Sequence, residues 1–188
     1  MSTADDHDAC YQGVDIVAAT RRADIRPMNP SNTVAFDAFY LARYRDALHL
    51  ATLLIWDEER AAEITQDAFV EAFRRWDRVS RFERPDLWLR RVLINRSISV
   101  RRRHRSETAA ISRLGRAPEP GGADAVDVGA WSLVGQLPTR QAQALALVYG
   151  CDLSLDEASA VMKCSVGSVK THLSRGRAGV AARLKERG

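Results

Sequence analysis

The feature that most constrains this chain is a strongly basic stretch, residues 84–105, which also carries two separate sets of apolar side chains. It holds eight arginines and a single acid, Asp86. Pro85 suits the first turn of a helix, and Asp86 suits the positive end of the helix dipole. At the helical period the apolar residues form two arcs: Trp88, Leu89, Val92, Leu93 and Val100 in one, and Leu87, Ile94 and Ile98 in the other.

A polar strip separates the two apolar arcs, and it is made of Arg91, Asn95 and Arg102. Apolar residues on two sides with arginines along the gap are typical of a helix that packs in a bundle and faces a polyanion. A solvated basic helix is the alternative interpretation. Because that alternative leaves the second arc and Trp88 unexplained, the sequence favours the packed helix.

Charge is distributed unevenly along the chain. The net charge is only +4, but residues 57–71 hold six acids against a single Arg60, and the arginine-rich stretch follows almost at once. Opposite charge blocks on neighbouring helices indicate two different partners, one basic and one acidic. With 188 residues, the chain is long enough for one large or two small domains.

The cysteines, Cys10, Cys151 and Cys164, are odd in number and lack CxxC spacing. A disulfide framework or a zinc site is therefore not expected, and a reducing compartment is. No apolar run is long enough to span a bilayer, and the N-terminus lacks the pattern of a signal peptide. These features predict a soluble cytoplasmic protein with no cofactor, no metal and no membrane insertion.

Helical rather than alternating periodicity predicts an all-α fold of two small helical domains joined by a flexible linker. Residues 1–31 are weakly patterned and are expected to form a mobile tail, with room for a short helix near 12–22. Residues 32–105 are expected to form a bundle of three main helices, near 33–56, 58–76 and 84–105. Ser31 or Asn32 would cap the first of them.

The second of these helices has one apolar face and one acidic face. The acidic face consists of Glu59, Glu63, Gln66 and Asp67. Surface acids usually serve solubility alone, but here no lysine stands at i+4 to compensate them. That absence weakens the solubility interpretation without removing it.

A short loop, residues 77–83, precedes the basic helix and contains Ser80, Arg81 and Phe82. An aromatic ring beside arginines in a short loop suits stacking on an exposed base. A phenylalanine tucked under its own bundle is the alternative, and the loop alone does not decide between the two.

Residues 106–129, rich in Gly, Ala and Pro, predict a flexible linker, and residues 130–188 predict a second helical domain. In that domain a helix near 139–149 ends at Gly150, and Ser154 and Glu157 form a capping box for the next short helix. After a tight turn, Ser165 caps a last helix, 166–186. Two helices joined in this way are typical of a helix-turn-helix.

The last helix has an inward apolar stripe and an outward polar face. The stripe consists of Val166, Val169, Leu173, Val180 and Leu184. The outward residues expected to contact DNA are Ser168, Lys170, Thr171, His172, Arg175 and Arg177. Small hydroxyl side chains let a helix sit deep in the major groove, while Lys and Arg reach phosphates and base edges. An ordinary αα-hairpin with a soluble face is the alternative.

Both predicted domains, in order and spacing, resemble an ECF-type (group IV) bacterial RNA polymerase sigma factor. Residues 61–69, AAEITQDAF, are similar to the core-binding helix of region two; residues 88–96, WLRRVLINR, with the arginines at 101–103, are similar to its minus-10 promoter helix. Residues 137–138, 153–158 (LSLDEA) and 164–170 (CSVGSVK) match region four. Lys163 departs from the family, which usually has Gly in that turn, and His172 stands where Arg is common.

The resemblance implies a role in transcription initiation through core RNA polymerase and promoter DNA. Glu59, Glu63, Gln66 and Asp67 would dock on the clamp of the largest subunit, and the polymerase flap region is a further expected contact. Arg91, Asn95 and Arg102 would hold the minus-10 element, and the Ser80, Arg81 and Phe82 loop would capture a flipped base. The last helix would read the minus-35 duplex. Family members are often held by an anti-sigma factor, which this sequence neither shows nor excludes.

Two other classes of function stay open. A stand-alone helix-turn-helix transcriptional regulator explains the last helix but neither the acidic face nor Trp88. An enzyme is disfavoured, because the histidines are scattered and no acid–base or nucleophile spacing recurs. Cys151 and Cys164 could sense redox state, although two buried small apolar side chains explain them better.

Overall fold

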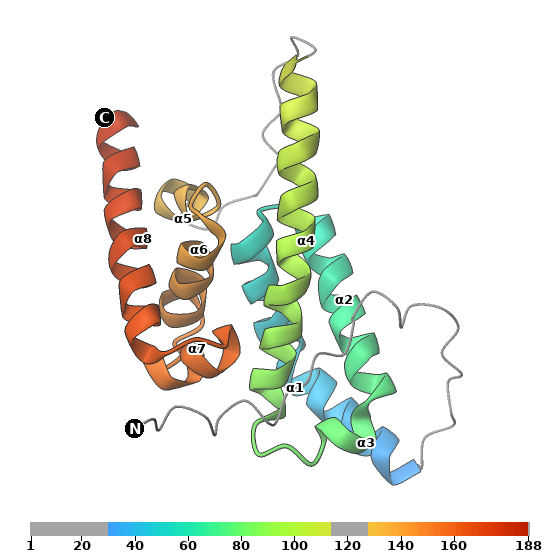
Figure 1. Cartoon of the computed structure of the whole chain (residues 1–188). Helices are drawn as coiled ribbons and strands as arrows, with labels where there is room; N and C mark the ends of the chain where they lie inside the picture. Colours follow the sequence, from blue (N-terminus) through green and yellow to red (C-terminus); the bar gives the residue numbers. More distant parts are fainter. Residues whose placement is uncertain (1–29, 114–127, 188) are drawn as a thin grey trace, which may run out of the picture.

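The computed structural model describes residues 30–113 and 128–187, and within them the chain is helical with no strand, which confirms the predicted all-α fold. The elements are α1 (Pro30–Ile55), α2 (Glu58–Arg74), α3 (Trp76–Val79), α4 (Pro85–Arg113), α5 (Val128–Val134), α6 (Thr139–Leu145), the π-helical turn η2 (Ala146–Gly150), α7 (Leu155–Met162) and α8 (Val166–Arg187). Figure 1 shows α4 in the middle, with α2 and α3 on one side, α5–α8 on the other, and α1 running behind α4. The predicted helix near 12–22 lies outside the described residues.

The first bundle, α1–α4, is built on the apolar faces that the periodicity predicts. The buried apolar residues of α2 are Ala61, Ile64, Ala68, Phe69 and Ala72. Asp57 caps α2, because its carboxylate accepts a hydrogen bond of 3.0 Å from the backbone N–H of Arg60. The ring of Phe36 in α1 meets those of Phe73 and Trp76 edge to face, with centroids 5.0 and 5.4 Å away.

Helix α4 is buried on two sides, as its two apolar arcs predict. Leu89 and Leu93 of the first arc are 2% and 0% exposed, and Ile94 of the second arc is 2% exposed. Helices α1 and α2 pack on α4 within the first bundle, while α7 packs on it from the second bundle. Ile98 is 38% exposed, so the burial of the second arc ends before that residue.

The second bundle, α5–α8, contains the predicted caps. Ser154 and Glu157 form the capping box: the Ser154 hydroxyl accepts from the Glu157 N–H at 3.2 Å, and the Glu157 carboxylate accepts from the Ser154 N–H at 2.9 Å. Ser165 caps α8, accepting from the Ser168 N–H at 3.2 Å. The prediction that Leu184 faces inward is wrong, since this side chain is 47% exposed where α8 extends past its neighbours.

Several boundaries differ from those predicted. Helix α1 begins at Pro30, so Asn32 lies inside its first turn, where its amide donates to the Asp77 carboxylate at 2.6 Å. The short helix α3 occupies part of the predicted loop. Helix α4 runs on to Arg113, into the predicted linker, because residues 106–113 include Ala109 and Ala110 and the first Gly stands only at 115.

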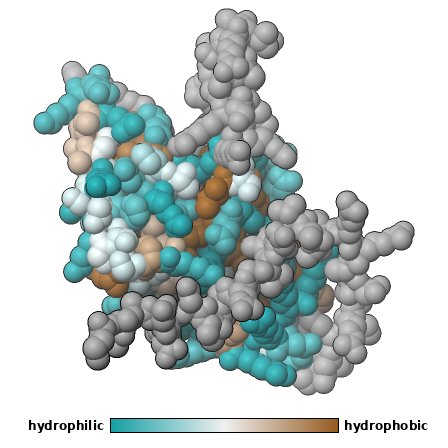
Figure 2. Space-filling view, viewed as in Figure 1, coloured by the Kyte–Doolittle hydropathy of each residue, from teal (hydrophilic) through white to brown (hydrophobic). Residues whose placement is uncertain are grey.

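The two bundles pack directly on each other, an arrangement that the sequence did not predict. One continuous cluster of buried apolar residues runs from Phe36 in α1 to Leu173 in α8. The surface in Figure 2 is mostly hydrophilic, and apolar side chains are visible along the junction of the bundles. The junction therefore resembles the inside of a domain more than a solvated gap.

Candidate nucleic-acid interface

The α7–α8 unit has the form of a helix-turn-helix. Helix α7 ends at Met162, and Lys163 follows in the left-handed region with φ 50° and ψ 55°. The N–H groups of Lys163 and Cys164 both reach back to the carbonyl of Ser159. Lys163 thus adopts the conformation for which glycine is usual, and the departure noted in the sequence leaves the turn intact.

Most of the residues predicted to read the minus-35 element lie on the open face of α8. Lys170, Thr171, Arg175 and Arg177 are exposed, while Ser168 and His172 are half-buried. The Ser168 hydroxyl lies 2.9 Å from that of Ser165, and the Thr171 hydroxyl donates to the carbonyl of Gly167 at 3.0 Å. The face therefore combines hydroxyl groups that are held by hydrogen bonds with exposed lysine and arginine side chains.

His172 lies among cations at the edge of this face. Burial lowers the pKa of His172, and the charges of Arg140 and Arg175 lower it further. The imidazole is therefore neutral at pH 7, with one ring nitrogen donating and the other accepting. Neutral histidine can hydrogen-bond a base edge without adding a charge.

The loop before α4 exposes two of its three predicted residues. Ser80 and Arg81 are exposed, whereas Phe82 is half-buried and packs on the core. The guanidinium carbon of Arg78 lies 6.0 Å from the centre of the Phe82 ring. The ring is partly tucked under its own bundle, yet it also forms a wall of an open cavity.

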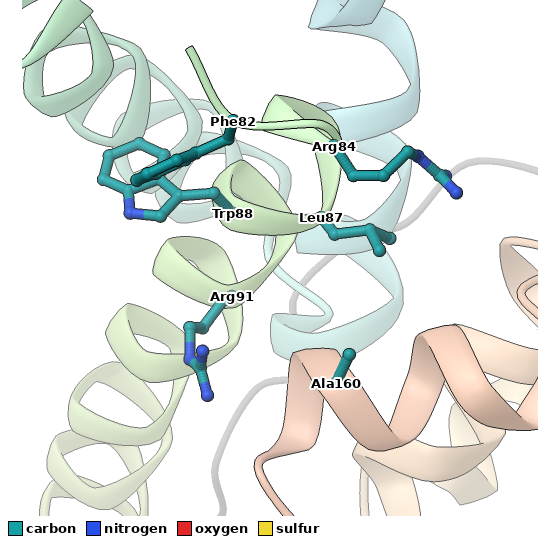
Figure 3. Close-up of a pocket in the computed structure, with 6 residues that line it drawn as sticks. All are labelled: Phe82, Arg84, Leu87, Trp88, Arg91 and Ala160. Atoms are coloured by element: carbon teal, nitrogen blue, oxygen red, sulfur yellow. The ribbon is translucent and has the colours of Figure 1, made fainter. Parts of the chain in front are cut away.

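That cavity, of about 210 Å3, is lined by Phe82, Arg84, Leu87, Trp88, Arg91 and Ala160. Figure 3 shows the rings of Phe82 and Trp88 together at one edge, Arg84 and Leu87 at another, and Ala160 of α7 facing them. Aromatic walls with cations beside them suit an unstacked base and its phosphate. In this structure the second bundle closes one side of the cavity.

The polar strip of α4 is only partly open. Asn95 is exposed and Arg91 is half-buried. Burial lowers the pKa of Lys163, and the positive charge of Arg91 lowers it further, so the turn of the second bundle lies close to this strip. Arg102 belongs to α4, but the structure does not describe the surroundings of its side chain.

Several arginines of the basic stretch are engaged inside the protein instead of facing a polyanion. Arg101 is 7% exposed and donates to the backbone carbonyls of Gly135 and Leu137, at 2.8 and 2.9 Å. Arg90 lies 3.7 Å from the carboxylate of Asp46 in α1. The number of arginines in the sequence does not show which of them are buried and which face solvent.

The predicted acidic face of α2 is exposed at Glu59, Glu63, Gln66 and Asp67. Asp67 is also an internal partner: Arg96 of α4 donates to it at 2.8 Å and to Glu71 at 3.0 Å. Sequence reasoning missed Val70, which is 40% exposed and continues the row of Glu59, Glu63 and Gln66 at helical spacing. The face is thus an acidic row with an apolar end.

Both described cysteines are free thiols and half-buried. Burial raises the pKa of the Cys151 thiol, and Arg90 of α4 opposes that shift. In the described part of the chain, no three His, Cys, Asp or Glu side chains are grouped to hold a metal ion. Across the same residues, no helix has the length and hydropathy that a membrane span requires.

A family model for sigma-70, region 4 matches residues 130–178. That range contains the α7–α8 unit and the residues predicted to contact the minus-35 element. The matched range covers the second bundle alone. The first bundle is covered by relatives that match most of the chain.

Two relatives are similar over most of the chain, and both are RNA polymerase sigma-E factors. The protein of Streptomyces avermitilis is 26% identical over 164 residues, 85% of this chain and 88% of the relative. The protein of Streptomyces coelicolor is 26% identical over 156 residues, 80% of this chain and 84% of the relative.

Two solved structures share the fold. CnrH in complex with the cytosolic domain of CnrY has a TM-score of 0.60 at 26% identity, covering 83% of this chain and 91% of that chain. The sigma factor RpoE in complex with the anti-sigma factor NepR from Bartonella quintana has a TM-score of 0.62 at 22% identity, covering 80% of this chain and 97% of that chain. These similarities extend over both bundles, since neither bundle alone reaches such coverage.

Proposed function

Because the chain belongs to the ECF-type sigma factors of bacterial RNA polymerase and directs transcription initiation, we propose that its two bundles divide promoter recognition between them. The second bundle, residues 130–188, reads the minus-35 element as duplex. The first, residues 32–105, binds core polymerase and opens the minus-10 element. Residues 106–129 connect them.

The observation that carries this proposal is the agreement between the region 4 match and the exposed face of α8. Lys170, Arg175 and Arg177 are exposed cations on the second helix of a helix-turn-helix, where duplex phosphates and base edges would lie. Ser168, Thr171 and His172 supply short polar groups on the same helix. Together they suit a helix lying in the major groove.

The minus-10 element is assigned to the start of α4 and the loop before it. Ser80, Arg81 and Phe82 would capture a base flipped from the non-template strand, with Trp88 as a second aromatic wall. Arg91, Asn95 and Arg102 would hold the strand beside it. Aromatic walls and cations suit single-stranded DNA better than duplex.

The acidic row of α2 is the proposed contact surface for core polymerase. Glu59, Glu63 and Gln66 are exposed, and Val70 adds an apolar contact at the end of the row. An acidic row suits a basic clamp surface on the largest subunit, and buried apolar contacts give such interfaces much of their affinity. The polymerase flap region would contact the second bundle.

The proposed role is non-catalytic and belongs in the bacterial cytoplasm, where core polymerase and promoters meet. An anti-sigma protein is included among its partners, because two structural relatives are described in complexes, one of them with a named anti-sigma factor. A stand-alone helix-turn-helix regulator is less well supported, since the curated relatives match both bundles.

Transcription by purified core polymerase with and without the protein tests this function. Sequencing of transcript starts should reveal new starts that depend on the protein and share a minus-10 and a minus-35 sequence. A Glu59→Lys, Glu63→Lys variant should lose core binding in a pull-down while keeping its circular dichroism. Asp67 is left intact, because its replacement would also break the Arg96 bridge.

Reversal of an acid outside the row supplies the matched control. Asp37→Lys reverses one exposed acid on α1, which is the same change of charge per residue as in the double variant, so it should retain core binding. Equal core affinity in the parent and the Glu59→Lys, Glu63→Lys variant would remove the docking assignment. Starts that do not depend on the protein would remove the function itself.

A further inference from the structure

The end of α7 is held from α6 by Arg140, a side chain that the sequence pattern does not single out. The Arg140 guanidinium donates to the backbone carbonyl of Met162 at 2.9 Å. Met162 is the last residue of α7 and is 2% exposed. The carbonyls in the last turn of a helix have no partner within that helix. Arg140 therefore supplies from α6 a hydrogen bond that α7 cannot supply for itself.

The start of α8, the helix proposed to read the minus-35 element, depends on where this carbonyl lies. Only Lys163, Cys164 and Ser165 separate Met162 from Val166, the first residue of α8. The backbone of Lys163 is left-handed, and the Ser165 hydroxyl caps α8. Because this connection is short and held at both ends, a shift of the Met162 carbonyl would also move the exposed face of α8.

Arg140 also acts on His172, a half-buried residue of that face. Burial lowers the pKa of His172, and the positive charges of Arg140 and Arg175 lower it further. Arg175 lies on α8 itself, whereas Arg140 comes from α6, which packs on α8. Helix α5 has no charged residue, and Asp156 and Glu157 of α7 do not shift this pKa. Among the described residues, Arg140 is therefore the charge from a neighbouring helix that favours the neutral ring.

A direct contact between Arg140 and a DNA phosphate is the alternative role, because Arg140 is exposed. The hydrogen bond to Met162 opposes this alternative. It is formed in the protein without DNA, and a guanidinium that left it for a phosphate would leave the carbonyl of a buried residue without that partner.

We propose that Arg140 is a positioning residue for minus-35 recognition, which fixes the end of α7 on α6 and thereby places His172 against the base edges. The proposal rests on the proposed function, in which α8 reads the minus-35 duplex. A neutral imidazole offers one donor and one acceptor, whereas an imidazolium offers two donors. Loss of Arg140 therefore changes both where His172 lies and which groups of a base it can pair with.

Three substitutions separate the bond and the charge of Arg140 from general effects. Arg140→Met removes both the donor and the charge while keeping a long side chain. Arg140→Lys keeps the charge and one donor group. Arg183→Met is the matched control, because Arg183 also donates to a backbone carbonyl, that of Gly179 at 3.0 Å, and lies on α8 beyond the matched range.

Binding of the polymerase complex to minus-35 duplexes tests the positioning role. The duplexes carry the minus-35 sequence of a promoter mapped with the protein, or a scrambled one, and electrophoretic mobility shifts give the preference between them. Arg140→Met should lower this preference about tenfold, with the slope of affinity against salt unchanged. Arg140→Lys should restore most of the preference, and Arg183→Met should leave it intact.

A phosphate contact gives a different result. It would weaken binding to both duplexes equally and reduce the log–log salt slope by about one, and that outcome would overturn the proposal. An unchanged preference in Arg140→Met would overturn it as well. If Arg140→Met loses its circular dichroism, Arg140→Gln, which keeps a donor without the charge, is held to the same two criteria.

The imidazole of His172 provides a readout that a merely structural role would not move. In the full chain with isotope-labelled histidine, its NMR signal is identified by its loss in His172→Gln. Arg140→Met should raise the pKa of His172, because a positive neighbour is removed, and Arg183→Met should not. The preference for the mapped sequence should then fall at a higher pH in Arg140→Met than in the parent.

An unchanged pKa of His172 in Arg140→Met would overturn the effect of Arg140 on this ring. A failure of the proposed function is distinct from all these outcomes, because it would be seen as transcript starts that do not depend on the protein.

Discussion

Gly135 lies against the indole ring of Trp56: a Cβ atom at this glycine would stand 2.5 Å from Cδ1 and 2.9 Å from Nε1 of the ring. Trp56 joins α1 to α2 and has a φ of 59°, which is rare for a large side chain. The two bundles therefore meet here through a residue without a side chain and one held in a strained backbone conformation. The fit leaves no room for even a methyl group.

Gly135→Ala should lower the free energy of unfolding by about 1–3 kcal/mol, because the added methyl must displace the rigid ring of Trp56. Urea denaturation followed by far-UV circular dichroism measures the change. Gly167→Ala is the matched control: its Cβ would meet only the Ser165 hydroxyl at 3.8 Å, and helix propensity favours alanine. A stability gain in both variants would contradict the packing described for Trp56.

Lys163→Gly should raise the free energy of unfolding by about 0.5–1 kcal/mol, because Lys163 has a φ of 50° and glycine adopts this region without strain. Thermal unfolding should show a midpoint higher by a few degrees. Lys163→Ala removes the same charge next to Arg91 but retains the left-handed backbone. If alanine stabilises as much as glycine does, charge repulsion and not strain is the cause.

The sequence predicts the helices well because their signals are local. Apolar periodicity and the caps at Ser154 and Ser165 need no knowledge of distant partners. The predicted end of α4 near residue 105 is wrong, because the residues after 105 are helix-forming but carry no regular apolar face. The π-helical turn at Gly150 has no comparable sequence signal.

The exposure of most candidate DNA-contacting residues on α8 was predictable from the sequence, but the surroundings of the α4 residues were not. The exposed face of α8 follows from helical spacing alone. The burial of Arg101 and the presence of Ala160 in the lining of the cavity depend on how the bundles pack, which no local pattern encodes. The second apolar arc of α4 was the one hint, since α4 packs on α7 of the second bundle as well as on α1 and α2.

Lys170→Ala should weaken binding of the polymerase complex to all minus-35 duplexes to a similar extent, because an exposed lysine on α8 suits a phosphate contact. The salt dependence should also become shallower, with the log–log slope falling by about one. Electrophoretic mobility shifts across a range of salt concentrations measure both quantities. A change confined to one base position would instead place Lys170 on a base edge. Lys185→Ala, beyond the matched range of α8, is the control.

Stability should fall on acidification partly through Glu157, and the sign follows from its contacts. The Ser154 N–H and then the Arg84 guanidinium hold the pKa of Glu157 below its ordinary value. A lowered pKa means that the stabilisation is complete above about pH 4.3 and is lost as pH falls through the folded-state value. Burial raises the pKa of Asp86, but its ion pair with Arg84 outweighs burial and lowers this pKa, so Asp86 contributes to stability in the same pH range.

The difference in the free energy of unfolding between the parent and Glu157→Gln, measured by urea denaturation, isolates Glu157. This difference should be largest near neutral pH and should shrink toward pH 3. A difference that is constant with pH would mean that the carboxylate charge does not hold the bundles together.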